Sequence, residues 1–403
     1  MKKIYYISNA LPNSLTGGSD FLAFNLLRKL KKKYKVYTIA IGSNYCKKKE
    51  LKLIHNELKK NKINYFEIKE NINYSKKPLS IFNFFDKNYI NQENTEKAKK
   101  FISTINIQEK DILFAYGSAS IIASSEIKSK KIALFEDIQN QVEIYRTFNS
   151  INKLNFIKKI LRLILLKIHY RGYYNWLRDI SSNHEIRYTF SPFDYRKLKS
   201  YFKLDILPVP MPEKIKKFQR KKNKPFNITM FSASISQDYN GVYLLFNKLI
   251  PFLIKKKVFD KVKINLIMRI PKNIPEGIKK ILKSKFINTY RYNKNILKET
   301  DLLFYPSKYP VGLRSKILFA FSQSWMVATS STVKKCIPEL EDFKNCLMSN
   351  NINILAKKII KIIERPKNYN YLIKDGYRVL KKYSVNNSFH KIDRDIRKYF
   401  DGK

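Results

Sequence analysis

Acidic residues are scarce in this chain, whose 403 residues include 32 Asp and Glu against 81 Lys and Arg, a net charge of +49. Solubility needs far less charge, so the excess predicts attraction to polyanions: an anionic membrane, nucleic acid or phosphorylated substrates. Codon bias is a second explanation, because Lys, Asn, Ile, Tyr and Phe, which have A/T-rich codons, are all abundant. Hydrophobic residues make up 44% of the chain, so we expect a large core and no global disorder.

Cysteines, histidines and long apolar runs are also few. Cys46, Cys336 and Cys346 have no metal-type spacing and suit a reducing compartment. The four histidines form no ligand pair at helical spacing. The apolar run near Met1 is too short for a signal peptide, and no run reaches the roughly 18 residues that a membrane span needs. We therefore expect a cytoplasmic protein.

Strand-like and helix-like segments alternate along the chain, and the alternation starts again in its second half. This pattern predicts an α/β fold with two parallel sheets, whose functional groups gather beyond the carboxyl ends of the strands. Prolines at 208, 210 and 212 cannot lie inside a helix and favour an extended linker. We place the boundaries at a first domain of 1–207, a linker of 208–225, a second domain of 226–384 and a terminal helix within 385–403.

The segment from Val311 to Ser331 is the main candidate site. Gly312 is predicted to start a helix, because apolar residues follow it at helical spacing. Arg314 and Lys316 fall in its first turn, where the helix dipole disfavours cations by about 0.3–1 kcal/mol each. A bound anion would reverse that effect, since free N–H groups and two cations would converge on it. The alternative is two solvated basic residues in a Lys-rich chain.

Two further pairs of residues follow predicted strands in the first domain. Gly17 and Gly18 lie between a strand and a helix that begins near Asp20, where they form either a phosphate cradle or a tight turn. Glu136 and Asp137 follow another strand, where they could orient an acceptor hydroxyl or act as a base. The alternative for Asp137 is a helix cap.

Residues 153–180 form a predicted basic helix. Bulky apolar residues alternate there with cations, and no acidic residue precedes Asp179. Such helices suit an anionic lipid interface, so a peripheral position on the cytoplasmic membrane face is one interpretation. A helix packed between domains is the other.

The segment from Val311 to Ser331 resembles the donor-binding segment of GT-B glycosyltransferases, in particular those of glycosyltransferase family four. Phe319 departs from the pattern, because the family often has a glutamate there that binds the donor sugar or ribose. The partner glutamate expected near Val311 is absent too. The residues that fit are Gly312, Arg314, Lys316, Ile317, Leu318, Ala320, Val327, Ala328 and Thr329.

The resemblance implies two Rossmann-like domains that face a central cleft, an acceptor-side domain first and a donor-nucleotide domain second, with the terminal helix crossing back to the first. It implies a hexosyltransferase that moves a sugar from a nucleotide-sugar with retention, without a metal or other cofactor. The acceptor would be a glycan or a lipid-linked molecule, in cell-surface polysaccharide or glycolipid synthesis.

The resemblance also assigns roles to individual residues. Gly312, Arg314 and Lys316 would bind the donor diphosphate. The family often has an Arg and a Lys in the first loop of the second domain, where this chain has Asn240, and Arg269, beyond the next strand, would supply the missing charge. Gly17 and Gly18 would face the cleft. Glu136 and Asp137 would lie near the acceptor, although Glu136 stands where the family would have a histidine. Asp393-Arg394-Asp395 matches the D-x-D string of metal-dependent enzymes, but its place in a C-terminal helix argues against that role.

Two other classes of function stay open. The absent glutamates at Val311 and Phe319 are compatible with a catalytically inactive binding protein on the same scaffold. The charge of +49 is compatible with a nucleic-acid-binding protein, although the sequence contains no recognisable RNA- or DNA-reading motif.

Overall fold

The computed structural model divides the chain into two compact units. Unit 1 comprises Met1–Pro210, Val311–Leu313 and Ser384–Lys403, and unit 2 comprises Met211–Pro310 and Arg314–Tyr383. The residues described are 2–14, 18–42, 48–68, 92–135, 156–212, 224–234, 239–269, 287–290, 299–307, 310 and 312–401.

Unit 1 is built around a seven-stranded sheet in the order β3-β2-β1-β4-β5-β6-β7, with every neighbouring pair parallel. The strands are β1 (Lys3–Ser8), β2 (Lys35–Ala40), β3 (Asn64–Glu67), β4 (Ile112–Tyr116), β5 (Lys130–Phe135), β6 (Ile186–Thr189) and β7 (Asp205–Ile206). The helices are α1 (Ser19–Leu30), α2 (Lys48–Lys60), α3 (Gln92–Ser103), α4 (Ser118–Ala123), α6 (Phe156–Ile180), α7 (Pro192–Leu198) and α15 (Val385–Phe400).

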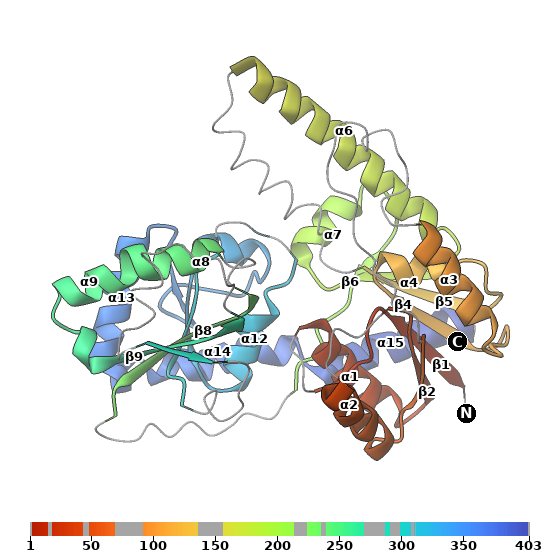
Figure 1. The fold of residues 1–403 in the computed structure, drawn as a ribbon, viewed down its shortest axis with the longest axis horizontal. Helices are drawn as coiled ribbons and strands as arrows, with labels where there is room; N and C mark the ends of the chain where they lie inside the picture. The colour runs from red at the N-terminus through yellow and green to blue at the C-terminus, as the bar shows by residue number, and fades with distance from the viewer. Residues whose placement is uncertain are drawn as a thin grey trace. The chain divides into compact units, whose positions relative to one another are not determined.

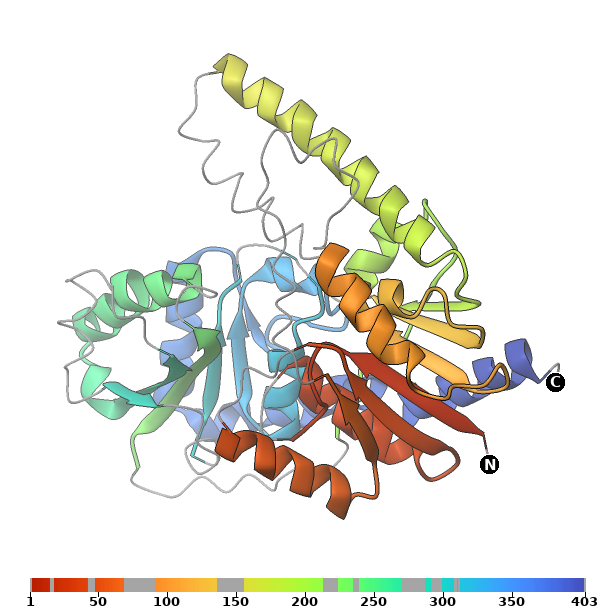
Figure 2. The same ribbon diagram turned by 45° about the vertical axis from the view of Figure 1, so that its right-hand side comes forward.

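Helices cover both faces of this sheet because its central strands are apolar on both sides. Successive strand residues point to opposite faces, so Tyr6 packs in the core beneath α1, α2 and α15, while Ile7 packs in the core beneath α3 and α4. The apolar run of β1 therefore serves two cores. Figures 1 and 2 show the two layers of helices around the strands.

The terminal helix α15 packs on unit 1, as predicted. The Tyr188 hydroxyl donates to Asp395 at 2.7 Å, and the Ser388 hydroxyl donates to the Pro208 carbonyl at 2.6 Å. Asp393 accepts hydrogen bonds from Lys33 and Tyr34. Both carboxylates of the Asp-Arg-Asp string thus hold α15 against unit 1.

Unit 2 is built around a six-stranded parallel sheet in the order β10-β9-β8-β11-β12-β13. The strands are β8 (Phe226–Ser234), β9 (Val262–Arg269), β10 (Ile287–Tyr290), β11 (Leu302–Tyr305), β12 (Met326–Thr329) and β13 (Leu347–Met348). The α-helices are α8 (Tyr239–Leu244), α9 (Ile250–Lys255), α12 (Ser315–Ser322), α13 (Ile352–Glu364) and α14 (Asn370–Lys382). Together the two units confirm the predicted α/β class with two doubly wound sheets.

Two details of unit 2 differ from the sequence-based expectation. The helix predicted to begin at Gly312 begins at Ser315, because Gly312 has a φ of 56° and a left-handed residue cannot continue a right-handed helix. The sequence also predicts a helix that runs to Lys256 with a kink at Pro251. In the structure a π-helical turn, Leu245–Leu249, joins α8 to α9 just before that proline. A further helix that the sequence predicts at 274–282 lies outside the described residues.

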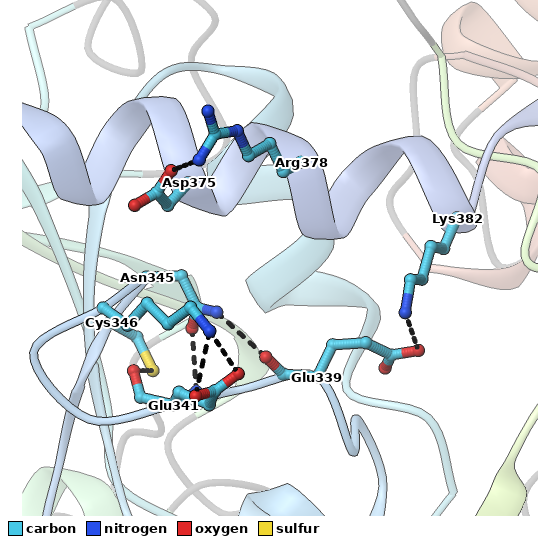
Figure 3. Close-up of polar contacts among 8 residues, drawn as sticks. Glu339, Glu341, Asn345, Cys346, Asp375, Arg378 and Lys382 are labelled. Carbon is cyan, nitrogen blue, oxygen red and sulfur yellow. Dashed lines mark hydrogen bonds and ion pairs between the residues drawn. The ribbon is translucent and has the colours of Figure 1, made fainter.

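The segment before β13 is fixed by side-chain hydrogen bonds to its own backbone (Figure 3). The buried Asn345 amide donates to the Glu339 carbonyl at 2.9 Å and accepts from the Glu341 amide at 3.0 Å. The Glu339 carboxylate in turn lies 3.5 Å from Lys382 on α14. This bracing places β13 at the edge of the sheet beside β12.

Candidate functional site

The two predicted cations of unit 2 lie near one aromatic ring at the carboxyl edge of the sheet. Arg314 is the residue that precedes α12, and its guanidinium carbon lies 6.0 Å from the centre of the Tyr305 ring. The Lys316 nitrogen lies 5.0 Å from the same ring and 5.9 Å from the ring of Phe231. Arg314 and Lys316 are therefore brought together, and Tyr305 and Phe231 are their neighbours.

Strand geometry fixes the position of Tyr305. It is the last residue of β11 and is buried, and its carbonyl accepts a hydrogen bond from the Thr329 hydroxyl of β12 at 2.7 Å. The Arg314 guanidinium also lies 3.5 Å from the Tyr305 hydroxyl, a long contact. The ends of β11 and β12 thus form a rigid base beneath the first turn of α12.

This arrangement gathers positive charge at a helix N-terminus. Cation–π contact stabilises each cation by about 0.5–2 kcal/mol, enough to offset the unfavourable helix dipole of about 0.3–1 kcal/mol. An aromatic ring carries no net charge, so it does not neutralise the cation above it. A diphosphate placed here would interact with two cations and with the first N–H groups of α12. The geometry therefore suits a phosphorylated ligand.

Phe319, which stands where a glutamate was expected, belongs to a cluster of three rings. Its ring lies 5.8 Å from that of Phe231 and 5.8 Å from that of Trp325, in edge-to-face contacts. Phe231 and Trp325 are 6.2 Å apart in the same orientation. Phe319 is only partly buried, and its edge-to-face contacts with two other rings give phenylalanine a packing role at this position.

Asn240 and Arg269 lie near the same edge of the sheet. Arg269 ends β9 and pairs with Ser234 of β8 after an irregularity in the register, and Asn240 is in the first turn of α8. The side chains of both lie outside the described set. A Cβ at Gly241 would come within 2.7 Å of the Met230 Cε, so a larger residue in α8 would require the end of that side chain to move.

The candidates of unit 1 are only partly described. Gly18 directly precedes α1 with a φ of 70°, a conformation that favours glycine. The connection before it is held by Glu57 of α2, which accepts a hydrogen bond from the Ser14 amide at 2.8 Å. Gly17, Glu136 and Asp137 lie outside the described residues, the last two directly after the end of β5.

Tyr305 and Phe231 are the site residues that the sequence analysis missed. A signal was present, since the strands that the sequence predicts at 227–231 and 301–305 end at these two residues, and functional groups gather at the carboxyl ends of strands in parallel sheets. The sequence alone suggests that both are core residues, because aromatic residues in strands are usually part of the core. Within the described part of the chain, no group of three or more His, Cys, Asp or Glu residues is placed to hold a metal ion.

Several solved structures share this fold along the whole chain. A glycosyltransferase from Rickettsia africae matches with a TM-score of 0.64 at 14% identity, covering 100% of this chain and 99% of that one. HepE from Anabaena, solved with UDP and glucose, matches with a TM-score of 0.65 at 10% identity, covering 99% and 100%. Sucrose-phosphate synthase from Thermosynechococcus elongatus matches with a TM-score of 0.66 at 11% identity, covering 100% of both chains.

No protein-family model matches the chain, and no curated protein matches it in sequence. Assignment to glycosyltransferase family four therefore stays a prediction. The structural matches extend over both units at low identity, and what they share with this chain is its architecture. Its two parallel-sheet α/β units have the GT-B fold.

Proposed function

We propose that the protein is a glycosyltransferase that uses a nucleotide-sugar donor. The observation that carries this proposal is the pairing of Arg314 and Lys316 over Tyr305 at the N-terminus of α12, within a GT-B fold. The donor diphosphate would bind these two cations and the first N–H groups of α12. The match to HepE solved with UDP and glucose supports a nucleotide-sugar as ligand.

The chemistry follows from where charge develops. When the bond between the anomeric carbon and the diphosphate breaks, negative charge grows on the leaving oxygen, and fixed cations next to it lower the barrier. Arg314 and Lys316 would supply this stabilisation without a metal or another cofactor. Asn240 and Arg269 would extend the donor site, with Gly312 allowing the turn before it. The donor sugar would be a hexose, transferred with retention.

The acceptor side belongs to unit 1 in this proposal. Glu136 and Asp137 would orient the acceptor hydroxyl, and Gly17 and Gly18 would let the chain approach the substrates closely. The acceptor would be a glycan or a lipid-linked molecule, in cell-surface polysaccharide or glycolipid synthesis on the cytoplasmic side of the membrane.

A turnover assay tests the proposal. Purified protein is incubated with a panel of nucleotide-sugars, with and without glycan and lipid-linked acceptors, and release of the nucleoside diphosphate is measured. We expect release with at least one donor and its loss in the Arg314→Ala/Lys316→Ala double variant. Lys255→Ala/Lys256→Ala, which removes the same charge from the end of α9, should retain activity. Equal activity in both double variants would contradict the assigned site.

The ring cluster around Phe319 favours a second candidate, a protein that binds nucleotides without turnover. Position 319 carries Phe in place of the expected glutamate, so it offers no carboxylate to a ligand, and its ring packs on Phe231 and Trp325. Calorimetry run beside the turnover assay separates the two. Diphosphate binding without release from any donor would favour the second candidate.

A further inference from the structure

Large apolar side chains on the first half of α6 are exposed. They are 41% to 77% exposed, and they are six of the twelve large exposed apolar side chains in the described part of the chain. At 3.6 residues per turn, their spacing places them within an arc of about 140° on one side of the helix. This apolar arc consists of Phe156, Ile157, Ile160, Leu161, Ile164 and Ile168.

The last turns of α6 carry the contacts that pack the helix onto unit 1. Tyr173, Tyr174 and Leu177 are buried in a core with Phe135 of β5 and Ile121 of α4. By helical spacing Tyr173 and Leu177 lie outside the apolar arc, whereas Tyr174 lies at its edge, in line with Phe156. The last turns are therefore anchored, and in Figures 1 and 2 the Phe156 end of α6 points away from the strands of unit 1.

Charge indicates what the apolar arc meets. The helix carries six Lys or Arg residues and no acidic residue before Asp179. Arg171 is exposed, and its spacing places it on the same side as the arc, closer to the anchored end. A second copy of a +49 chain would bring like charges together, whereas an anionic lipid surface takes up both apolar side chains and cations.

We propose that the apolar arc of α6 docks onto an anionic membrane surface. Ile160, Ile164 and Ile168 would enter the boundary between headgroups and acyl chains, and Arg171 would meet the headgroups. In the described residues no helix is long and apolar enough to span a membrane, so this contact would be peripheral. The inference goes beyond the proposed glycosyl transfer and does not depend on it.

Vesicle co-sedimentation of the full chain tests the inference, with phosphatidylcholine vesicles that contain or lack phosphatidylglycerol. We expect binding to the anionic vesicles and a fall of about tenfold or more in the Ile160→Ser/Ile164→Ser/Ile168→Ser variant. The matched control Leu53→Ser/Ile254→Ser/Ile354→Ser changes three exposed apolar side chains elsewhere and should bind like the wild type. Circular dichroism checks that both variants fold.

Fluorescence locates the contact. When anionic vesicles are added, the fluorescence emission of the Ile164→Trp variant should shift to shorter wavelength and be quenched by brominated acyl chains. The emission of the Ile254→Trp variant should show neither change. Wild-type-like vesicle binding by the arc variant would overturn the inference, because the net charge alone would then explain binding. Two results for the wild type would also overturn the inference: binding to oligonucleotides without binding to vesicles, and self-association through the apolar arc in sedimentation velocity.

Discussion

Charged residues make different contacts at the terminal helix of unit 1 and at the candidate site of unit 2. In unit 1, Asp393 and Asp395 of α15 meet cations and hydroxyl groups: Asp393 contacts Lys33 and Arg397, and Asp395 contacts Lys391. In unit 2, Arg314 and Lys316 lie against the ring of Tyr305. The first arrangement pairs opposite charges and fixes a helix, whereas the second gathers two cations near one aromatic ring at the start of a helix.

The pKa values in α15 agree with a structural role. Burial raises the pKa of Asp393, but hydrogen bonds from Lys33, Tyr34 and Arg397 outweigh it, so the net pKa lies below the usual 3.8. The Asp395 pKa is lowered in the same way, with burial outweighed by Tyr188 and Lys391. Carboxylates that stay charged and paired stabilise the fold. Cation–ring contacts also occur around α15, where Lys33 lies over Tyr34, so what distinguishes the candidate site is two cations near one ring at the first turn of a helix.

The largest effect is expected when both cations of the candidate site are removed. In isothermal titration with UDP, Arg314→Ala/Lys316→Ala should lose about 3–5 kcal/mol of binding free energy, because two charge-assisted interactions with the diphosphate disappear. The free energy of unfolding should hardly change. Lys255→Ala/Lys256→Ala is the matched control and should bind UDP like the wild type. An unchanged affinity for UDP in the Arg314→Ala/Lys316→Ala variant would contradict the assignment of this site.

A smaller effect, on stability, should come from α15. Asp393→Ala should lower the free energy of unfolding by about 2–3 kcal/mol, because it leaves Lys33, Tyr34 and Arg397 without their shared carboxylate. Urea unfolding measures the change. Asp375→Ala removes a carboxylate that forms an ion pair with the exposed Arg378 one helical turn away, and it should cost below about 1 kcal/mol. Equal losses would contradict the structural role of Asp393.

The free energy of unfolding should fall at acidic pH because of His184 in unit 1. Burial, together with Lys131 and Arg187, lowers the pKa of His184 to about 3 from 6.5, and neither ring nitrogen has a partner among the described residues. Below pH 6.5, His184 therefore takes up a proton in the unfolded chain but stays neutral in the folded chain. Stability should therefore fall by about 2 kcal/mol from pH 7 to pH 5.

The His184 effect occupies a pH window of its own. Asp393 and Asp395 contribute stability above their usual pKa of 3.8 and lose it only as the pH falls below that value. Urea unfolding of His184→Phe should show a flatter profile between pH 7 and pH 5. The control His390→Gln should keep the wild-type slope. A steep profile in His184→Phe would assign the loss to other groups.

Much of the fold could be predicted from the sequence because its signals are local. The apolar runs at 4–7, 111–116, 131–135 and 301–305 predict β1, β4, β5 and β11 to within one residue at each end, and their alternation with helices predicts parallel pairing. The packing of α15 on unit 1 was given by resemblance. Such inferences succeed because a strand buried on both faces needs a continuous apolar run.

The site was predicted less well, because its geometry depends on contacts between distant residues. Arg314 and Lys316 could be named from their place near a helix start, but their contact with Tyr305 depends on where β11 ends. The start of α12 was set three residues early, because the sequence does not reveal the left-handed backbone of Gly312. The packing of Phe319 against Phe231, far away in sequence, was equally hidden.

A crystal structure of the protein soaked with UDP tests the central claim most directly. We predict that the diphosphate oxygens lie within about 3 Å of the Arg314 guanidinium and the Lys316 ammonium, at the first turn of α12. UDP bound with both cations turned away from its phosphates, or held by another part of the chain, would contradict the assignment.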